Sequence, residues 1–248
     1  QTIQNDENIT QAKQKMEEHS LRAIPVVDSK NRLTGAVGYR DLIRHIQFNP
    51  SRTGLEKVMH QPPQFDKTES LVDIAQLRIN SGRKMLVNTH QDKVKGVIGD
   101  NEFREAFKQM DQLGKVTTLD LGTSNLVRVF EEDSVEEARH KMLDNNISRL
   151  PVLDENGNLS GILKSTDLLQ LIVPRERQNS GGTSGKSLKD TKIAGGSEKE
   201  SMNDIEVKEV MDRNPITQEG HMDIDEALDL LSEKDQKELI IVENGYPE

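Results

Sequence analysis

The sequence has no cysteine and no tryptophan, and only 3% of its 248 residues are aromatic. Without cysteine there is no disulfide framework, thiol nucleophile or zinc–thiolate site. The scarcity of aromatic side chains removes the stacking platforms on which single-stranded nucleic acids usually bind. The lack of disulfides also suits the cytoplasm, and we expect the protein to reside there.

The chain also lacks an excess of basic charge and any long hydrophobic run. Its net charge is −10, whereas binding to a nucleic-acid backbone requires clustered lysines and arginines, so we do not expect nucleic acid as the main partner. No apolar run approaches the ~20 residues that span a bilayer, so we expect no membrane insertion. The chain opens at Gln1 rather than at a methionine, which leaves open whether it is a fragment of a longer protein.

Residues 148–172 have the pattern of one complete structural unit. Two short apolar runs, 150–153 and 161–163, flank a turn containing Asn156-Gly157, which predicts a β-hairpin. The second run is followed by three residues that can cap a helix: Ser165, Thr166 and Asp167. Leucines and isoleucine at helical spacing come next, so the hairpin is expected to lead into an amphipathic helix.

Other parts of the chain repeat this unit. Pro25 stands ten residues before Gly35, and Pro151 stands ten residues before Gly161. In a second copy Leu86 replaces the proline, with a glycine again ten residues later. A predicted helix with an alanine on its apolar face precedes each copy: Ala12, Ala75, Ala138 and Ala227. Such periodicity predicts four tandem repeats with one long insertion before the fourth.

This pattern resembles the cystathionine-β-synthase (CBS) domain family. The family pattern is strand, helix, strand, strand, helix, with a Pro-Val pair opening the hairpin and a Gly-aliphatic-aliphatic-Thr-x-x-Asp signature closing it. The third copy matches nearly all of it, and the repeats cover the chain apart from the connectors. The resemblance implies an α/β (α+β) fold in which each repeat is a small sheet with two helices. It also implies that the repeats form two pseudo-twofold pairs, known as Bateman modules.

We predict these segments: repeat one at 1–48, repeat two at 58–108, repeat three at 121–173, a flexible linker at 174–206, and repeat four at 207–248. Residues 109–120 are expected to link the two halves. The linker before repeat four is rich in Gly, Ser, Lys and Glu, and such a segment buries too little apolar surface to offset its ordering entropy. Repeat four is expected to be incomplete, without its second hairpin strand and closing helix. Repeats one and two should form one module, and repeats three and four the other.

Asp167 is the leading candidate for ligand binding. A carboxylate at a helix N-terminus can accept two hydrogen bonds from a ribose cis-diol, and the nearby amides and helix dipole suit phosphate oxygens. The resemblance implies the same role, because the aspartate of this signature holds ribose in CBS domains. The alternative is that Asp167 only caps its helix.

Five further residues of repeat three are candidate ligand contacts. Lys164 stands where the family has threonine, so the usual hydroxyl is missing, although Thr166 can supply one. Ser148 and Arg149 precede the Pro-Val pair at positions where the family often reaches phosphates, and an arginine fork suits that role. A surface ion pair is the alternative for Arg149, and a solvated charge is the alternative for Lys164. Ile162, within the signature, joins the list of expected contacts.

Repeat one offers a second candidate site, and repeat four contributes one residue. Asp41 and Arg40 belong to the signature of repeat one, and Arg22 precedes its Pro-Val pair; a helix cap is the alternative for Asp41. The resemblance aligns Thr2 with the strand that offers backbone contacts to adenine. Thr217 lies where other strands meet the cleft, with ordinary strand-edge polarity as its alternative.

No catalytic constellation is visible, because the six histidines occur singly and beside no nucleophile motif. We therefore expect no enzymatic activity, no required cofactor and no metal. The resemblance implies a regulatory sensor that binds AMP, ADP, ATP or S-adenosylmethionine between paired repeats, forms a homodimer and acts on an effector protein. The alternatives are a ligand-free dimerisation scaffold and the cytosolic regulatory part of a transporter or enzyme.

Overall fold

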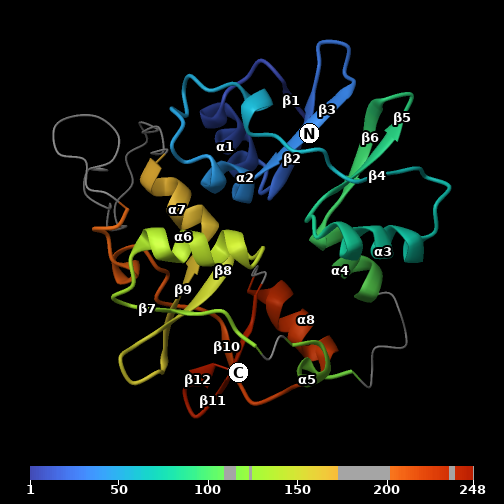
Figure 1. The fold of residues 1–248 in the computed structure, drawn as a ribbon. Helices are drawn as coiled ribbons and strands as arrows, with labels where there is room; N and C mark the ends of the chain where they lie inside the picture. The colour runs from blue at the N-terminus through green and yellow to red at the C-terminus, as the bar shows by residue number, and fades with distance from the viewer. Residues whose placement is uncertain (109–115, 123–124, 173–201, 235–237, 248) are drawn as a thin grey trace, which may run out of the picture.

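A computed structural model describes residues 1–108, 116–122, 125–172, 202–234 and 238–247 (Figure 1). These residues form four three-stranded sheets with the strand orders β1-β2-β3, β4-β5-β6, β7-β8-β9 and β10-β11-β12. In every sheet the first two strands pair in parallel and the last two pair antiparallel. The predicted mixed α/β fold with four repeats is therefore confirmed.

The elements recur in the same order in each repeat. Repeat one contains β1 (Ile3–Gln4), α1 (Ile9–Glu18), β2 (Ala23–Val27), β3 (Leu33–Gly38) and α2 (Tyr39–Arg44). Repeat two contains the short helix η1 (Leu55–Lys57), β4 (Gln64–Phe65), α3 (Leu71–Ser81), β5 (Leu86–His90), β6 (Lys93–Ile98) and α4 (Asp100–Lys108). Repeat three contains α5 (Thr118–Leu121), β7 (Val129–Phe130), α6 (Val135–Asp144), β8 (Arg149–Leu153), β9 (Leu159–Lys164) and α7 (Ser165–Ile172). Repeat four contains η2 (Val207–Glu209), β10 (Thr217–Glu219), α8 (Ile224–Glu233), β11 (Ile240–Glu243) and β12 (Tyr246–Pro247).

Local sequence signals explain where these elements begin and turn. The side chains of Asn8, Ser70 and Ser134 accept hydrogen bonds from backbone amides in the first turns of α1, α3 and α6. Such caps satisfy amides that have no partner inside the helix. In the hairpin of repeat three the turn residue Gly157 has a φ of 86°, a backbone conformation that glycine adopts without strain.

The sheet of repeat one packs against the sheet of repeat two, and repeats three and four pack in the same way. Ala36 and His60 exchange two backbone hydrogen bonds, and Ile162 and Asp212 exchange two in the equivalent place. Ala36 is packed with Val87 of repeat two, whereas Ile162 packs with two residues of β11, Ile240 and Val242. This is the pairing that the repeat pattern predicted.

Close approach at this crossing requires glycine in two of the three hairpins that carry the signature glycine. A Cβ atom on Gly161 would lie 2.8 Å from the backbone oxygen of Asp212 and 2.8 Å from the sulfur of Met211. A Cβ atom on Gly35 would lie 2.6 Å from the sulfur of Met59, whereas one on Gly96 would meet nothing within 4 Å. The signature glycine therefore lets the chain that leads into repeats two and four cross the preceding hairpin.

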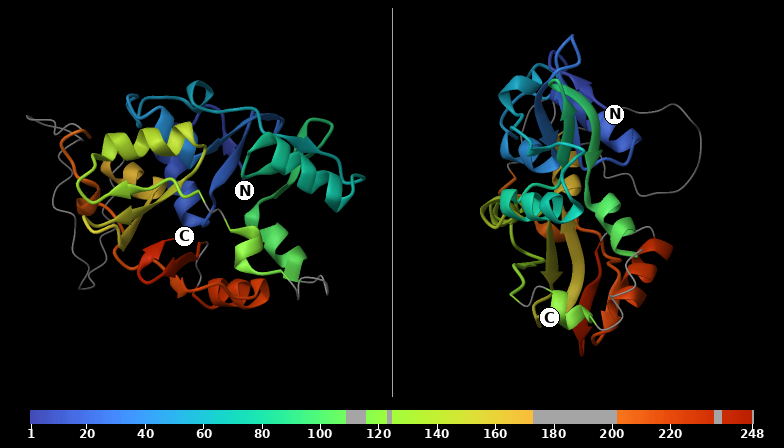
Figure 2. Two further views of the ribbon diagram at one scale, coloured as in Figure 1. Left: turned by 60° about the horizontal axis from the view of Figure 1, so that its bottom comes forward. Right: turned by 90° about the vertical axis from the view of Figure 1, so that its right-hand side faces the viewer.

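The two pairs are joined by their helices, so that repeat one lies beside repeat three and repeat two beside repeat four (Figures 1 and 2). Helix α2 contacts α7 and α6, and α4 contacts α8. The largest hydrophobic core contains side chains from both halves of the chain, and the following four are completely buried: Met16, Ile43, Met142 and Leu168. The two modules of this one chain are thus packed against each other through their helices.

Four sequence-based expectations need correction. Residues 116–120 of the expected linker 109–120 belong to the packed fold, because the amide of Thr118 donates to the oxygen of Met222 at 2.9 Å and α5 thereby attaches to repeat four. Val87 rather than Leu86 takes the place of the hairpin proline, since Asn88 pairs with Gly96 as Val26 pairs with Gly35. The spacing of residues along the sequence does not reveal this shift, because repeat two has lost one residue between the two strands.

Repeat four is more complete than expected, because β12 supplies a short second hairpin strand that pairs with β11. Asn244 and Gly245, with φ of 54° and 87°, allow the tight turn between them. The last part of the predicted flexible linker is ordered, since Met202 and Ile205 pack against the core beside repeat three. Residues 173–201 and 109–115 lie outside the described residues. Within the described residues no helix is long and apolar enough to cross a membrane.

Candidate functional site

A cavity of about 680 Å³ opens where the four repeats meet. Its lining comes from the start of β2, the start of α2, the segment before β5, helix α4, the ends of β8 and β9, and helix α8. These are the ends of the strands and helices at which the modules face each other. The cavity therefore belongs to the assembled chain rather than to any single repeat.

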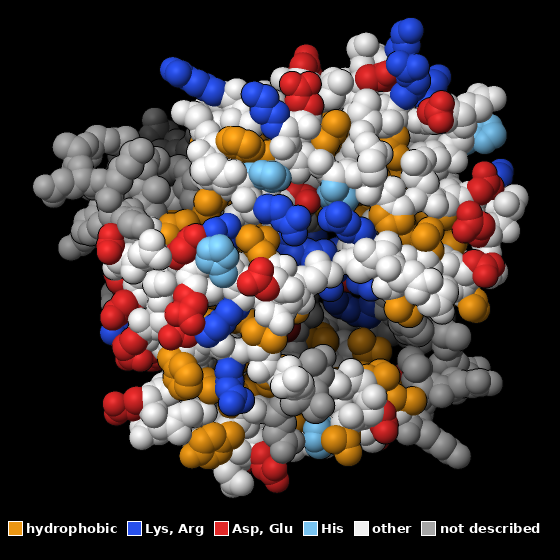
Figure 3. Space-filling view, in the orientation of Figure 1, with side chains coloured by type: hydrophobic (Ala, Val, Ile, Leu, Met, Phe, Trp, Pro, Cys, Tyr) orange, Lys and Arg blue, Asp and Glu red, His pale blue; other side chains and the backbone are white. Residues whose placement is uncertain are grey.

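The cavity is strongly basic although the chain is acidic. Seven lysines and arginines are among the described lining residues: Arg22, Arg40, Arg83, Lys84, Arg104, Arg149 and Lys164. The acidic lining residues are Glu17, Asp41 and Glu105. The space-filling view shows lysine and arginine side chains gathered around a hollow near the centre of this face (Figure 3). Such a concentration of one charge in a concave site attracts anions.

Burial, with repulsion between neighbouring cations, lowers the pKa values of three basic groups of the cavity. Burial and then the nearby charge of Arg149 lower the pKa of Arg22 to about 10. Burial and the charge of Arg83 lower the pKa of Arg40, and burial lowers that of Lys84 despite the opposing effect of Asp100. A bound anion would relieve this repulsion, so the cavity is prepared for negative charge.

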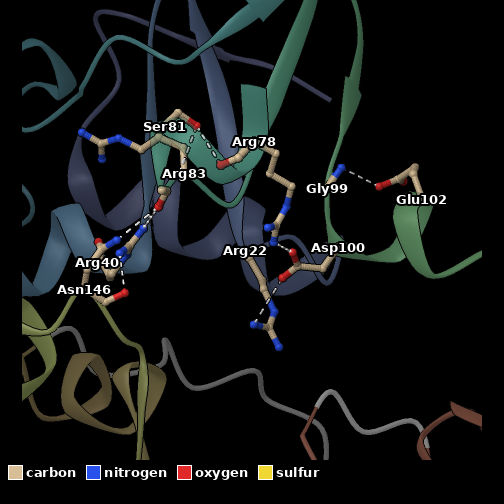
Figure 4. A network of polar contacts seen from close by, with 10 residues as sticks. Arg22, Arg40, Arg78, Ser81, Arg83, Gly99, Asp100, Glu102 and Asn146 are labelled. Atoms are coloured by element: carbon tan, nitrogen blue, oxygen red, sulfur yellow. Dashed lines mark hydrogen bonds and ion pairs between the residues drawn. The ribbon is translucent and has the colours of Figure 1, made fainter. Parts of the chain in front are cut away.

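A polar network fixes part of the basic wall (Figure 4). Asp100 forms an ion pair with Arg78 and lies 3.9 Å from the guanidinium of Arg22. The Nη2 atom of Arg22 is buried and has no hydrogen-bond partner among the described residues. Arg40 instead donates to two backbone oxygens, to that of Asn146 at 2.8 Å and to that of Gly82 at 3.2 Å. It therefore ties repeats one, two and three together.

Asp41 lines the cavity and is held by two hydrogen bonds. Its Oδ2 atom accepts from the amide of Gly38 at 2.8 Å and lies 2.8 Å from Nδ1 of His60. Its Oδ1 atom faces Arg83 at 3.8 Å. The helix-capping interpretation of Asp41 is thus realised, while one oxygen still points to a cation of the cavity.

Asp167 occupies the equivalent place in repeat three. Its Oδ2 atom accepts from the amide of Lys164 at 2.8 Å, as the cap interpretation expected. Burial raises the pKa of Asp167 to about 6, and the neighbouring charge of Asp212 acts in the same direction. The favourable effects of Lys164 and Arg149 oppose this rise without cancelling it.

The two cations of repeat three are paired with acids of repeat four. The Nε atom of Arg149 lies 2.6 Å from Oε2 of Glu238, an ion pair without hydrogen-bond alignment. The ammonium of Lys164 lies 2.9 Å from Oδ2 of Asp212 and 3.9 Å from Oε1 of Glu238. Both cations therefore take part in partly buried ion pairs; an ion pair was the alternative that the sequence left for Arg149, whereas the alternative for Lys164 was a solvated charge.

The structure brings most of the predicted site residues together. Seven of them line the cavity: Ser148, Arg149, Lys164, Thr166, Arg22, Arg40 and Asp41. Asp167 accepts a hydrogen bond from the amide of Lys164, and Ile162 is 2% exposed because it packs between the sheets of repeats three and four. Thr2 precedes β1, and Thr217 pairs with Ile240 at an exposed position of β10. These four do not line the cavity.

Several lining residues were not anticipated from the sequence. Arg83 and Lys84 precede Met85 and β5, and no motif of repeat two marks them as candidates. Arg104 lies on α4 and carries no motif. His60 was one of six scattered histidines, and its bond to Asp41 depends on the crossing of the two repeats.

The fold and the site define the class: four small αβ repeats, arranged as two pairs around a shared cavity. The sequence model of the CBS domain matches residues 1–47 and 119–174, which are repeats one and three. The other two repeats have the same strand and helix order. Residues 1–47 and 119–174 are thus CBS domains, and the fold supports tandem CBS repeats along the chain.

Comparisons with individual proteins agree with this. Uncharacterized protein MJ1404 of Methanocaldococcus jannaschii is 27% identical over 194 residues, which are 75% of this chain and 45% of that protein. A homoserine O-acetyltransferase of Methanosalsum zhilinae is 32% identical over 105 residues, which are 42% of this chain and 20% of the enzyme. The chain thus spans less than half the length of these two curated relatives.

One solved structure covers nearly the whole chain. Protein MJ1225 from Methanocaldococcus jannaschii superposes with a TM-score of 0.78 and 16% sequence identity, over 99% of this chain and 90% of that chain. At this identity the likeness is one of fold. That protein is described as a proposed archaeal homologue of g-AMPK.

Proposed function

We propose that the chain is a non-catalytic regulatory module that binds an adenine nucleotide in the basic cavity. The observation that carries the proposal is the surplus of cations in a concave site of an otherwise acidic protein. Phosphate groups suit arginine and lysine donors, and partial burial strengthens these contacts. The CBS resemblance supplies the adenosine part of the proposal.

The charge of the cavity discriminates between the candidate ligands. AMP, ADP and ATP carry an increasing negative charge, whereas S-adenosylmethionine has a sulfonium and an ammonium group that the same cations repel. The cavity therefore favours the phosphorylated ligands. In this proposal Lys84 and Arg22 contact phosphate, and Asp41 contacts ribose; Asp167 is the second ribose candidate.

A ligand that touches several repeats can act as a regulator. Each module contributes lining residues, so a bound nucleotide favours the arrangement in which those residues converge. The nucleotide binds two arrangements of the modules with different affinities, and this difference sets the free energy available for signalling to a partner. The effector is a separate domain or protein that senses the relative position of the two modules.

Isothermal titration of AMP, ADP, ATP and S-adenosylmethionine into the full chain tests the proposal. We expect binding of the phosphorylated ligands, weaker at high salt, and about tenfold weaker binding by Lys84→Ala. Lys95→Ala, which removes an exposed lysine of the same repeat, is the matched control and should bind as the wild type does. If none of the four ligands binds, the proposal is wrong and a ligand-free scaffold takes its place.

A comparison of Asp41→Ala with Asp167→Ala assigns the ribose contact. Asp41 lines the cavity and Asp167 does not, so we expect the larger loss of AMP affinity for Asp41→Ala. Thermal shifts at saturating AMP offer a second readout, because a ligand at 100 times its Kd adds about 2.7 kcal/mol to the free energy of unfolding. Equal affinities for both variants and the wild type would exclude both aspartates.

One observation favours a second candidate function. The likeness to homoserine O-acetyltransferase covers only 20% of that enzyme, so a segment of this type occurs within a much longer enzyme. In this second candidate the chain is the regulatory part of an enzyme. A full-length reading frame that encodes a catalytic domain beside these repeats would decide for it.

A further inference from the structure

The two halves of the cavity differ at positions that the repeats make equivalent. In repeat one the central hairpin begins with the pair Ala23 and Gly38, whereas in repeat three the same register pairs Arg149 with Lys164. Repeat three thus places two long cations side by side where repeat one has almost no side chain. If these two cations were unpaired, the half of the cavity built by repeats three and four would bind anions more strongly than the half built by repeats one and two.

The carboxylates that face Arg149 and Lys164 both come from repeat four. Glu238 lies 2.6 Å from Arg149, and Asp212 lies 2.9 Å from Lys164. The side chain of Glu238 is 17% exposed and that of Arg149 is 25% exposed. The two cations are therefore neutralised inside the chain, in surroundings where their electrostatic attraction is only partly screened.

Neither carboxylate has an equivalent between repeats one and two. His60 exchanges backbone hydrogen bonds with Ala36 as Asp212 does with Ile162, so a histidine takes the place of Asp212. The amides of Ile240 and Val87 each donate to a backbone oxygen next to the first strand of their own repeat, so these two residues are equivalent. Glu238 stands two residues before Ile240, and Met85 stands two residues before Val87. The equivalent of Glu238 is therefore apolar.

The cations of repeats one and two are correspondingly less neutralised. Arg22 lies 3.9 Å from Asp100, and Arg83 lies 3.8 Å from Asp41, so both pairs are loose. Lys84 forms no ion pair with any residue that the structure describes. An anion bound there pairs with these cations without displacing a carboxylate.

We propose that Glu238 and Asp212 are built-in anions that close the repeat three and four half of the cavity, and that phosphate is thereby directed to Arg22, Arg83 and Lys84. A phosphate on Arg149 would have to displace Glu238 and leave its carboxylate unpaired and partly buried, or bind against its charge. Glu238 thus determines where the anionic end of the ligand lies. This inference rests on the proposed function for the identity of the ligand.

Titration of inorganic phosphate into Glu238→Gln tests this directly. The substitution keeps the shape of the side chain and frees Arg149, so we expect phosphate affinity to rise about tenfold over the wild type. The matched control is Glu155→Gln, which removes the same charge from an exposed position in the turn of the β8–β9 hairpin, at the end opposite to Arg149. It should stay within about twofold of the wild type.

The double variant Glu238→Gln with Arg149→Ala completes the test. We expect it to lose the gain in phosphate affinity, because Arg149 is the group that Glu238 neutralises. An affinity of Glu238→Gln equal to that of Glu155→Gln, or a gain that survives Arg149→Ala, would overturn the inference. If Glu238→Gln does not fold, Asp212→Asn replaces it, with Lys164→Ala as the second substitution and the same expected outcomes.

The same titrations separate this inference from the proposed function. If adenine nucleotides fail to bind the wild type but Glu238→Gln gains phosphate affinity through Arg149, the proposed function fails and the built-in anion stands. If AMP binds the wild type and Glu238→Gln gains nothing, the proposed function stands and the built-in anion fails.

Discussion

Replacing Asp167 by asparagine should make the protein less sensitive to pH. Asp167 has a pKa raised from 3.8 to about 6, mainly by burial. Between these two values the folded chain holds a proton that the unfolded chain has released. The free energy of unfolding therefore falls as the pH rises from ~4 to ~6, and stays lower above that range.

The size of the effect follows from the pKa difference. One pKa unit corresponds to about 1.36 kcal/mol, so a rise from 3.8 to about 6 costs the folded state roughly 3 kcal/mol at pH 7. Asp167 is only half-buried, and solvent reduces such effects, so we expect between about 1 and 3 kcal/mol. Asparagine retains an oxygen that can accept from the amide of Lys164, so the helix cap is kept.

Urea unfolding of both proteins at several pH values between ~4 and ~8 measures this difference. Groups that titrate identically in wild type and Asp167→Asn cancel in the comparison. We expect the variant to gain stability relative to the wild type as the pH rises through this range. Parallel stability curves, or a relative loss by the variant above pH ~6, would refute the assignment of a raised pKa to Asp167.

Three further predictions concern the assembly. Met142→Ala should lower the free energy of unfolding by about 2–5 kcal/mol because Met142 is 0% exposed. Its control is Ile79→Ala, at the same place in repeat two but 68% exposed, which should change the free energy of unfolding by less than ~1 kcal/mol. Equal losses of the two variants in urea unfolding would contradict this packing. Gly161→Ala should lower the free energy of unfolding by about 1–3 kcal/mol, since its Cβ would lie 2.8 Å from the backbone oxygen of Asp212. Gly96→Ala, with open space around the added Cβ, should leave the melting temperature close to that of the wild type. A larger loss for Gly96→Ala than for Gly161→Ala would show that the crossing is not tight. Arg40→Ala should lower the free energy of unfolding by about 1.5–3 kcal/mol, because it removes the hydrogen bonds to the backbone oxygens of Asn146 and Gly82. The control in chemical unfolding is Arg52→Ala, which removes an exposed arginine. Equal unfolding midpoints of the two variants would mean that these hydrogen bonds contribute nothing to stability.

The repeats themselves could be predicted because their signals are local. Periodic apolar residues, turn dipeptides and capping residues act over a few positions, and each of them recurs along the chain. The alanines Ala12, Ala138 and Ala227 are all buried in equivalent helices. Ala75 is only partly buried, and the adjoining Ile79 is exposed, because the packing around α3 is less complete.

The register of repeat two escaped prediction for a physical reason. A strand can lose one residue near its bulge and still keep its alternation, so the spacing from Leu86 to Gly96 looked regular. Only the ladder of hydrogen bonds shows that Val87 takes the place of Pro25. The role of residues 116–121 depends in the same way on a contact with repeat four.

The amino-acid sequence alone determined the family, the number of repeats and the two signature aspartates, because these depend on neighbours along the chain. The tertiary structure decided which cations share one cavity and which carboxylates neutralise them. Arg22, Lys84 and Arg149 lie far apart in the sequence, and Glu238 reaches Arg149 only after repeats three and four have paired. Electrostatic interactions act through space, so the charge balance of the site exists only in the folded chain.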